Sequence, residues 1–563
     1  MGIMEVSCML TSITWDRVHL HIDVKASLIQ PSKIPHRYKK RKPVAVLGNR
    51  PDLSFVLRSP SGTFHLKSVP TGTAGTYRVK INVTNLRERR EIPDGTWKLI
   101  PMLHGQACLP TAFPADQLSR LRAWSKTFLY DNNTQAYVVN FDLSEDDERP
   151  EVVMRTYHLS RTVPPVKVTG GIKTRMKAWW MKNDYDRKLV QFWHDAWRTL
   201  TPPPGNRVLL AAQQRTKIDG NLRCVRDQLV ARGLGQQLDI QEWCDTNQKG
   251  FMVNLKSRLR LAHLMGTSDL VLIDDYCKLL DELNPDPKTV IAQLWHAGYG
   301  FKAVGFSRFG MYGSPRLESG HRKYTYTICG STTLQPIYAE VFGIEQAAVL
   351  PTGLPRIDEF LDADRIKGVK ESFYRDYPAL KGKRIVLFAP TFRGRGHADA
   401  RYDYSRIDFA SLHEWCGPNT VILFRMHPFT KTKPPIPEKY QDKLIDFAAY
   451  PSTNDLLHMT DILITDYSSI VYEFSLLNKP MLFFAYDEAE YRATRGFHGN
   501  YRKVAPGKVC NTFDELLTSL TFGDFDFEKV AQYRQRYFDY TDTGSTGRVI
   551  DRLVLPSLPH LKG

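Results

Sequence analysis

The sequence predicts an α/β protein with parallel sheets, preceded by an all-β sandwich. Two observations predict this class. Residues 1–162 contain short, often alternating apolar runs separated by turn residues, a pattern typical of antiparallel sheets. From residue 206 onward, apolar runs alternate with longer helical stretches, which indicates parallel sheets covered by helices. The 563 residues are enough for two to four domains.

The N-terminal region reads as an accessory β-sandwich domain over residues 1–162. Six runs have the composition of strands, and turn sequences such as SPSG and IPDG separate them. These runs are 54–57, 63–66, 77–83, 97–100, 136–141 and 152–157.

Residues 163–205 form a basic, tryptophan-rich segment that we expect to be a helical linker. Leu189, Val190, Trp193 and Trp197 recur at spacings of three and four residues. Pro164-Pro165 and the sequence TPPPG at 201–205 mark the limits of this segment.

The remaining chain is expected to fold as two α/β halves, residues 206–365 and residues 366–563. Buried parallel strands read as short, nearly continuous apolar runs between helical stretches. Such runs lie at 208–212, 269–273, 289–294, 384–389, 420–424, 461–464 and 481–485.

The composition restricts the classes of protein and partner. Lys+Arg 77 against Asp+Glu 60 leaves a net charge of +17, which favours nucleic acid, an anionic membrane or phosphate-rich substrates, or reflects only a solvated basic surface. The eight cysteines form no CxxC pair, which argues against a zinc site or disulfide framework and favours a reducing cytoplasm. The sequence contains no apolar run of 18 residues, and its start lacks the pattern of a signal peptide.

Polar, glycine or phosphate-compatible residues follow directly after five of the predicted strands. Because ligands bind beyond the carboxyl ends of strands in open α/β sheets, these positions predict a cleft lined by strand ends. The five segments are 295–298, 390–393, 425–428, 465–469 and 486–487.

One of these segments has the features of a nucleotide site. Ser468 and Ser469 open an expected helix, where free backbone N–H groups attract phosphate. Glu473 follows on the same helix face and can accept the hydroxyls of a ribose. The alternative is a simple capped helix with a surface glutamate.

Basic residues and histidines elsewhere allow phosphate chemistry, each with a structural alternative. Arg425 and His427 could bind a diphosphate, or His427 could be a structural histidine beside a proline turn. His296 could be a general base or a packed histidine. Arg356 could serve a phosphate or a surface salt bridge.

Six motifs in a fixed order resemble the CDP-glycerol glycerophosphotransferase family, the teichoic-acid polymerases and primases of Gram-positive bacteria. They are LWHAGYGFKAVG (294–305), LPTGLPRID (350–358), VLFAPTFRGRG (386–396), LFRMHP (423–428), ITDYSSIVYEFSLLNKPMLFFAYDEAEYRATRGF (464–497) and APGKV (505–509). Two positions depart from the family pattern: the family often has Gly-Thr-Pro where this chain has Ala297-Gly298-Tyr299, and Asp where Glu473 stands.

The resemblance implies a GT-B fold, two Rossmann-like halves with the CDP-polyol donor bound by the C-terminal half. It implies that His296 and His427 are catalytic. The donor-binding residues that it implies are Trp295, Gly298, Arg356, Pro390, Thr391, Arg393, Arg425, Met426, Asp466, Ser468, Ser469 and Glu473.

The implied reaction moves glycerol phosphate or ribitol phosphate from CDP-glycerol or CDP-ribitol to a hydroxyl of a lipid-linked glycan or teichoic-acid acceptor, with release of CMP. His296 would be the base, and His427 and Arg425 would stabilise charge on the diphosphate. We expect no tightly bound cofactor and no metal. The alternatives are a nucleotide-sugar glycosyltransferase on the same fold and a non-catalytic protein that binds polyanions or membranes; no nucleic-acid motif is recognised.

A lipid-linked acceptor implies a peripheral protein at the cytoplasmic face of the cell membrane. Two basic segments are candidates for docking to an anionic membrane surface, although the 189–200 stripe could instead pack on the α/β core. The sequence leaves a homo-oligomer open. The candidate membrane residues are Arg37, Lys39, Lys40, Arg41, Lys42, Lys173, Arg175, Lys177, Trp179 and Trp180.

Overall fold

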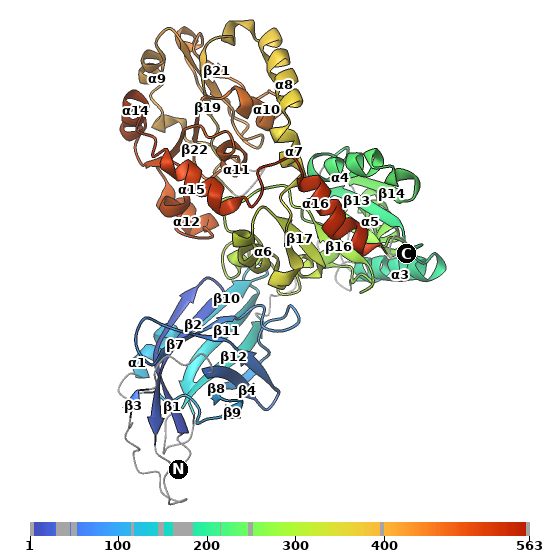
Figure 1. Ribbon diagram of the computed structural model, residues 1–563, viewed down its shortest axis with the longest axis vertical. Helices are drawn as coiled ribbons and strands as arrows, with labels where there is room; N and C mark the ends of the chain where they lie inside the picture. The colour runs from blue at the N-terminus through green and yellow to red at the C-terminus, as the bar shows by residue number, and fades with distance from the viewer. Residues whose placement is uncertain are drawn as a thin grey trace, which may run out of the picture. The chain divides into compact units, whose positions relative to one another are not determined.

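The computed structural model describes residues 5–29, 45–46, 53–113, 118–144, 151–160, 184–213, 215–245, 251–394 and 399–558. Figure 1 shows the course of the chain, which divides into two compact units. The first, called here the β unit, consists of residues 1–167, 304–322 and 340–344. The second, the α/β unit, consists of residues 168–303, 323–339 and 345–563.

Two antiparallel sheets form the β unit. One sheet has the order β1-β2-β7-β6 with β3 beside β2, and the other has the order β10-β11-β12-β8-β4-β5 with β9 beside β8. The elements are β1 (Glu5–Asp16), β2 (His19–Ile29), β3 (Ala45–Val46), β4 (Leu53–Ser59), β5 (Gly62–Leu66), β6 (Ser68–Pro70), β7 (Thr76–Asn82), β8 (Gly95–Leu103), β9 (Gln106–Ala107), α1 (Leu118–Trp124), β10 (Lys126–Tyr130), β11 (Gln135–Leu143) and β12 (Val152–Ser160).

A single apolar core lies between these sheets, with Val6, Leu20 and Val79 from one sheet and Phe55 and Tyr137 from the other. In the longer strands such as β7 and β11, alternate residues enter this core, as the period of two in a β-strand requires. The expected all-β sandwich is therefore confirmed.

Two segments from the middle of the chain complete this core. Phe306, Phe309 and Leu317 belong to it, and the Phe309 ring lies 5.4 Å from the rings of both Phe128 and Tyr130. The β unit thus contains three separate stretches of sequence. The four-part division expected from the sequence stays a prediction.

The α/β unit contains two six-stranded parallel sheets. The first half has the order β14-β13-β15-β16-β17-β18 and the second half the order β21-β20-β19-β22-β23-β24. The strands are β13 (Arg207–Gln213), β14 (Asp239–Asp245), β15 (Leu270–Ile273), β16 (Val290–Gln293), β17 (Tyr326–Cys329), β18 (Val349–Pro351), β19 (Arg384–Phe388), β20 (Thr420–Phe424), β21 (Leu444–Asp446), β22 (Ile462–Thr465), β23 (Met481–Phe484) and β24 (Lys508–Cys510).

Both sheets reverse their strand order beside the first strand, β13 or β19, which is where ligands bind in doubly wound folds. Helices connect the strands, and α7 and α8 lead from one half to the other. The helices are α3 (Tyr185–Leu200), α4 (Gly220–Ala231), α5 (Phe251–Gly266), α6 (Gln335–Phe342), α7 (Pro355–Leu361), α8 (Ala363–Asp376), α9 (Phe409–Cys416), α10 (Thr453–Met459), α11 (Val471–Ser475), α12 (Glu488–Arg495), α13 (Tyr501–Val504), α14 (Phe513–Phe522), α15 (Glu528–Tyr537) and α16 (Ser545–Val549).

The last helix, α16, returns to the first half and lies beside α4 and α7 (Figure 1). At the start of α16, the backbone N–H groups of Ser545 and Thr546 donate hydrogen bonds to the Asp358 carboxylate of α7, at 2.8 Å and 2.7 Å. Because a negative charge at a helix N-terminus is favourable, these bonds hold α16 against α7.

Residues 184–205 of the expected linker are described and contain α3. The candidate membrane residues between 37 and 42 and between 173 and 180 lie outside the described residues. The Trp197 ring of α3 lies 4.3 Å from the His263 ring of α5, so this part of the stripe packs on the α/β unit. Within the described ranges, no helix is both long and apolar enough to cross a membrane.

Candidate active site

The turn after β16 carries His296 and has an unusual backbone. Trp295 lies in the left-handed region (φ 45°), which is costly for a residue with a bulky side chain. The Asn221 side chain of α4 donates to the carbonyl oxygens of Leu294 (3.0 Å) and Trp295, and the Gln293 side chain accepts from the Trp295 N–H (2.9 Å). These hydrogen bonds hold the turn and therefore position His296.

One contact sets the tautomer of the His296 ring. Its Nδ1 lies 3.1 Å from the carbonyl oxygen of Asp274, directly after β15. Because a carbonyl oxygen only accepts, the neutral ring carries its proton on Nδ1 and keeps a lone pair on Nε2. Burial and the nearby Arg356 lower the pKa of His296, while the Asp275 carboxylate, 3.6 Å from Nδ1, raises it. The net pKa is below the usual value, so the imidazole is neutral at pH 7.

Asp274 is almost fully buried behind this histidine. Its side chain is 1% exposed, and one oxygen pairs with Nη1 of Arg215 at 2.8 Å. Burial raises the pKa of Asp274 to about 6, against the influence of Arg215. The edge of the first sheet thus combines a neutral histidine with two carboxyl groups.

Arg356 connects this turn with the second half. Its guanidinium donates to the His296 carbonyl oxygen and forms an ion pair with Glu473 of α11. Its backbone N–H donates to the Asn221 side chain (3.0 Å). The Arg356 side chain is 20% exposed, and its phosphate-binding role stays a prediction. Glu473 is 2% exposed, and its ribose-binding role stays a prediction.

Gly298 lies against Tyr472 of α11. A Cβ at Gly298 would overlap the Tyr472 ring, and a Cβ at Gly330 would overlap its hydroxyl. The ring stacks on Phe538 at 4.1 Å, and its hydroxyl donates to the Tyr537 carbonyl oxygen at 3.2 Å. Any residue larger than glycine at either position would collide with the Tyr472 side chain. The space that Gly298 and Gly330 leave for it is called here the Tyr472 slot.

A second group of predicted residues lies at the carboxyl ends of β19 and β22. Asp466 accepts hydrogen bonds from the backbone N–H (2.8 Å) and hydroxyl (2.9 Å) of Thr391 and pairs with Arg393 at 2.7 Å. Arg393 also donates to Asp487 at 2.8 Å, after β23. Pro390 is buried beside them. These groups bond to each other and hold three strand ends together; their donor-binding role stays a prediction.

The segment after β20 holds the other predicted histidine. His427 Nδ1 accepts the Phe429 N–H at 3.1 Å, so the neutral ring carries its proton on Nε2. Its ring lies 4.7 Å from those of Phe392 and Phe429. Arg425 donates to the Ala448 carbonyl oxygen, and Met426 is buried in the core of the second half.

The expected helix start at Ser468 and Ser469 is wrong by two residues. Helix α11 begins at Val471, Ile470 is its N-cap, and no side chain caps it. The Ser468 hydroxyl accepts the Ile470 N–H at 3.4 Å, and the Ser469 carbonyl accepts the Tyr472 N–H at 3.0 Å. These local bonds form a turn, and the helix therefore begins only after it, at Val471.

Sequence reasoning missed Asn221, Arg215, Asp274, Asp275 and Tyr472. Asp274 and Asp275 follow a predicted strand, so the rule applied to the other strand ends would have found them. Asn221 lies more than 70 residues from the turn that it supports, and no local pattern marks it. In the described part of the chain, no group of three His, Cys, Asp or Glu side chains is arranged to hold a metal ion.

Comparison with known proteins identifies related sequences. The sequence model of the CDP-glycerol:poly(glycerophosphate) glycerophosphotransferase family matches residues 199–555. The teichoic acid ribitol-phosphate polymerase TarL of Staphylococcus aureus is 37% identical over 354 residues, 62% of each chain. The teichoic acid poly(ribitol-phosphate) polymerase of Bacillus spizizenii is 36% identical over 369 residues, 65% of this chain and 59% of that protein. This chain thus spans less than two thirds of either polymerase.

A glycerol relative is more distant: the teichoic acid glycerol-phosphate primase of Bacillus subtilis is 28% identical over 298 residues, 52% of this chain and 75% of that protein. Among solved structures, the wall teichoic acid polymerase TagF has a TM-score of 0.53 at 16% identity and covers 70% of this chain and 100% of its own. The similarity to TagF confirms the fold expected from the sequence, a GT-B arrangement of two Rossmann-like halves.

Proposed function

The chain belongs to the CDP-glycerol:poly(glycerophosphate) glycerophosphotransferase family, and from this we propose that it transfers a polyol phosphate from a CDP-polyol to a hydroxyl of a teichoic-acid acceptor. The observation that carries the proposal is the orientation of His296, whose unprotonated Nε2 is available beyond the carboxyl edge of the first sheet. The family match gives the class of reaction, and this geometry supports His296 as the base.

The proposed reaction is an in-line displacement at phosphorus. The acceptor oxygen bonds to the β-phosphorus of the CDP-polyol, and the bond from that phosphorus to the bridging oxygen breaks, so that CMP leaves with the bonding electrons. The hydroxyl proton passes to Nε2 of His296. His427 presents the opposite tautomer, because its Nε2 carries a proton and can donate to a phosphate oxygen.

The relatives favour CDP-ribitol as the donor. The ribitol-phosphate polymerases are 36–37% identical to this chain, whereas the ribitol-phosphate and glycerol-phosphate primases of Bacillus spizizenii are both 30% identical, so the preference for ribitol rests on the polymerases. We therefore place CDP-ribitol first and CDP-glycerol second. The acceptor is a teichoic-acid chain or its lipid-linked precursor, and the protein acts as a peripheral protein at the cytoplasmic face of the membrane.

CMP release tests the proposal. The purified protein is incubated with a polyol-phosphate acceptor and either CDP-ribitol or CDP-glycerol, and CMP is measured. We expect turnover with CDP-ribitol, a loss of about 10²-fold in His296→Ala, and little change in the control His413→Ala, whose ring pairs with Asp442 on the second half. No CMP from either donor, or equal turnover in His296→Ala and the wild type, would refute it.

A further inference from the structure

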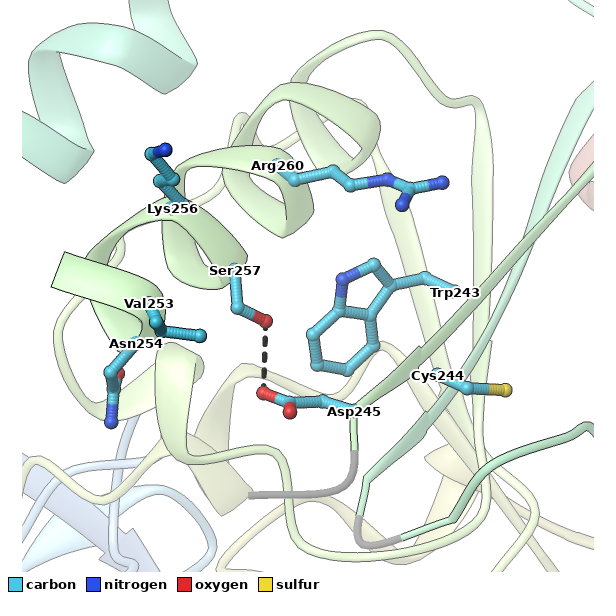
Figure 2. Close-up of a pocket in the computed structure, with 8 residues that line it drawn as sticks. All are labelled: Trp243, Cys244, Asp245, Val253, Asn254, Lys256, Ser257 and Arg260. Carbon is cyan, nitrogen blue, oxygen red and sulfur yellow. Dashed lines mark hydrogen bonds between the residues drawn. The ribbon is translucent and has the colours of Figure 1, made fainter. Parts of the chain in front are cut away.

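A pocket lies at the carboxyl end of β14, against the first turns of α5 (Figure 2). Its volume is about 270 Å³. Ligand pockets for drug-sized molecules span roughly 300–1,000 Å³, so this one suits a smaller group than a nucleotide. It is lined by Trp243, Cys244, Asp245, Val253, Asn254, Lys256, Ser257 and Arg260.

The floor of the pocket offers a hydrogen-bond donor. Trp243 is only 4% exposed, and no side chain or carbonyl among the described residues accepts a hydrogen bond from its indole nitrogen. Figure 2 shows this nitrogen on the side of the ring that faces Ser257 and Arg260. This N–H is open to the pocket, so it can donate to a ligand that accepts a hydrogen bond.

Two cations on the same face of α5 line the pocket. Lys256 and Arg260 are one helical turn apart, both are exposed, and neither forms an ion pair with any described residue. The acidic side chain of the pocket, Asp245, already accepts a hydrogen bond from the Ser257 hydroxyl at 2.9 Å. The lining therefore carries two positive charges against one carboxylate, which favours an anionic ligand. A guanidinium binds phosphate oxygens particularly well.

The pocket and His296 lie on the same edge of one sheet. The strands β14, β13, β15 and β16 are adjacent and parallel, so their carboxyl ends point the same way. Three inter-strand spacings separate β14 from β16, which is about 14 Å. A short polymer can span this distance.

We infer that this pocket binds a phosphodiester of the growing polyol-phosphate chain, while the terminal hydroxyl of the same chain lies at His296. The inference rests on the proposed function and names the part of the acceptor that the enzyme recognises. It assigns Lys256 and Arg260 to acceptor binding, and neither touches the reacting atoms.

The decisive experiment compares two acceptors. One carries a terminal polyol but no internal phosphodiester, and the other carries several polyol-phosphate repeats. In Lys256→Gln with Arg260→Gln, we expect the KM for the longer acceptor to rise about tenfold, with kcat and the KM for the shorter acceptor unchanged. The control is Lys367→Gln with Lys370→Gln, which removes two exposed charges from α8. An equal change for both acceptors, or none, would overturn the inference.

Direct binding separates this inference from the proposed function. Calorimetric titration of the full chain with an oligo(ribitol phosphate) needs no turnover. Loss of affinity in the double variant, and a smaller loss in Trp243→Phe, which removes only the indole donor, would support the site even if the wild type released no CMP. Unchanged affinity in both variants, or no binding to the wild type, would refute the site independently of catalysis.

Discussion

The two histidines of the site differ in which ring nitrogen carries the proton. The Asp274 carbonyl fixes the proton of His296 on Nδ1, whereas the Phe429 N–H fixes the lone pair of His427 on Nδ1. The same residue type therefore presents a lone pair on Nε2 at one position and a proton on Nε2 at the other. Neither assignment can be read from the sequence, because both depend on a backbone group brought close by folding.

The negative charge of Asp275 affects the pKa of His296. Asp275 raises the pKa of His296, so Asp275→Asn should lower it further and move the acid limb of the pH–rate profile to lower pH, with a smaller kcat because a weaker base accepts the proton. The groups that face His296 are Asp274, Asp275, Arg215 and Arg356. The measurement is kcat against pH. Since a purely structural role for Asp275 would lower kcat at every pH alike, an unmoved acid limb would exclude the tuning role.

At the scale of elements, the Tyr472 slot joins the turn after β16 to α11. Gly298→Ala should place a Cβ into the Tyr472 ring and destabilise the protein by about 1–3 kcal/mol, the usual cost of overpacking. The matched control is Gly368→Ala in α8, where a Cβ meets nothing within 4 Å and alanine favours the helix. Denaturant unfolding measures both. Equal stability of the Gly298→Ala variant and the wild type would show that the slot is not rigid.

Strands and their ends could largely be predicted, but some elements could not. The apolar runs at 384–389 and 420–424 correspond to β19 and β20, because buried parallel strands leave a continuous apolar signal. Strands β1 and β2 were missed. They meet in a tight turn where Arg17 has φ 55°, without the glycine or asparagine that usually marks such a turn.

The long-range contacts that bring the site residues together could not be predicted from the sequence. Arg356 and Glu473 were each singled out, but nothing local indicates that residues 117 positions apart form an ion pair. The same holds for Asn221, whose side chain supports a turn in a distant part of the chain. Periodicity reports which face of an element is buried, not which element covers it.

For the whole molecule, buried histidines predict a loss of stability in acid. Burial lowers the pKa of His19 and His458 to about 4 and that of His321 to about 3, whereas unfolded histidine titrates near 6.5. The unfolded chain therefore binds protons that the folded chain does not, and stability falls as the pH drops below 6.5 toward 4. At pH 5 each histidine costs up to about 2 kcal/mol.

Thermal unfolding at pH 7.5 and pH 5.0 checks this expectation. His458→Phe should keep the Tm at pH 7.5, because the ring already lies 4.4 Å from that of Phe360, and should reduce the loss at pH 5.0. A wild-type Tm that is the same at both pH values would contradict the prediction.

The two basic segments also predict that the whole chain docks on an anionic membrane. Each cation near an anionic surface contributes about 1 kcal/mol, so we expect salt-sensitive binding to anionic vesicles. Flotation should show weaker binding when Lys39, Lys40, Arg41 and Lys42, or Lys173, Arg175 and Lys177, become Gln, and no change in Lys367→Gln with Lys370→Gln. A wild type that stays unbound at low salt would rule out electrostatic docking.

The β unit is built from three separate stretches of sequence, and this limits how related proteins can exchange domains. The chain enters this unit three times, and Phe306 and Phe309 from the second passage share its core with Phe128 from the first. Exchange of the N-terminal region between two relatives by one recombination event would leave these aromatic rings facing a foreign surface. A working hybrid therefore needs crossovers that move all three stretches together, so we expect the sandwich to be exchangeable only along with residues 304–322 and 340–344.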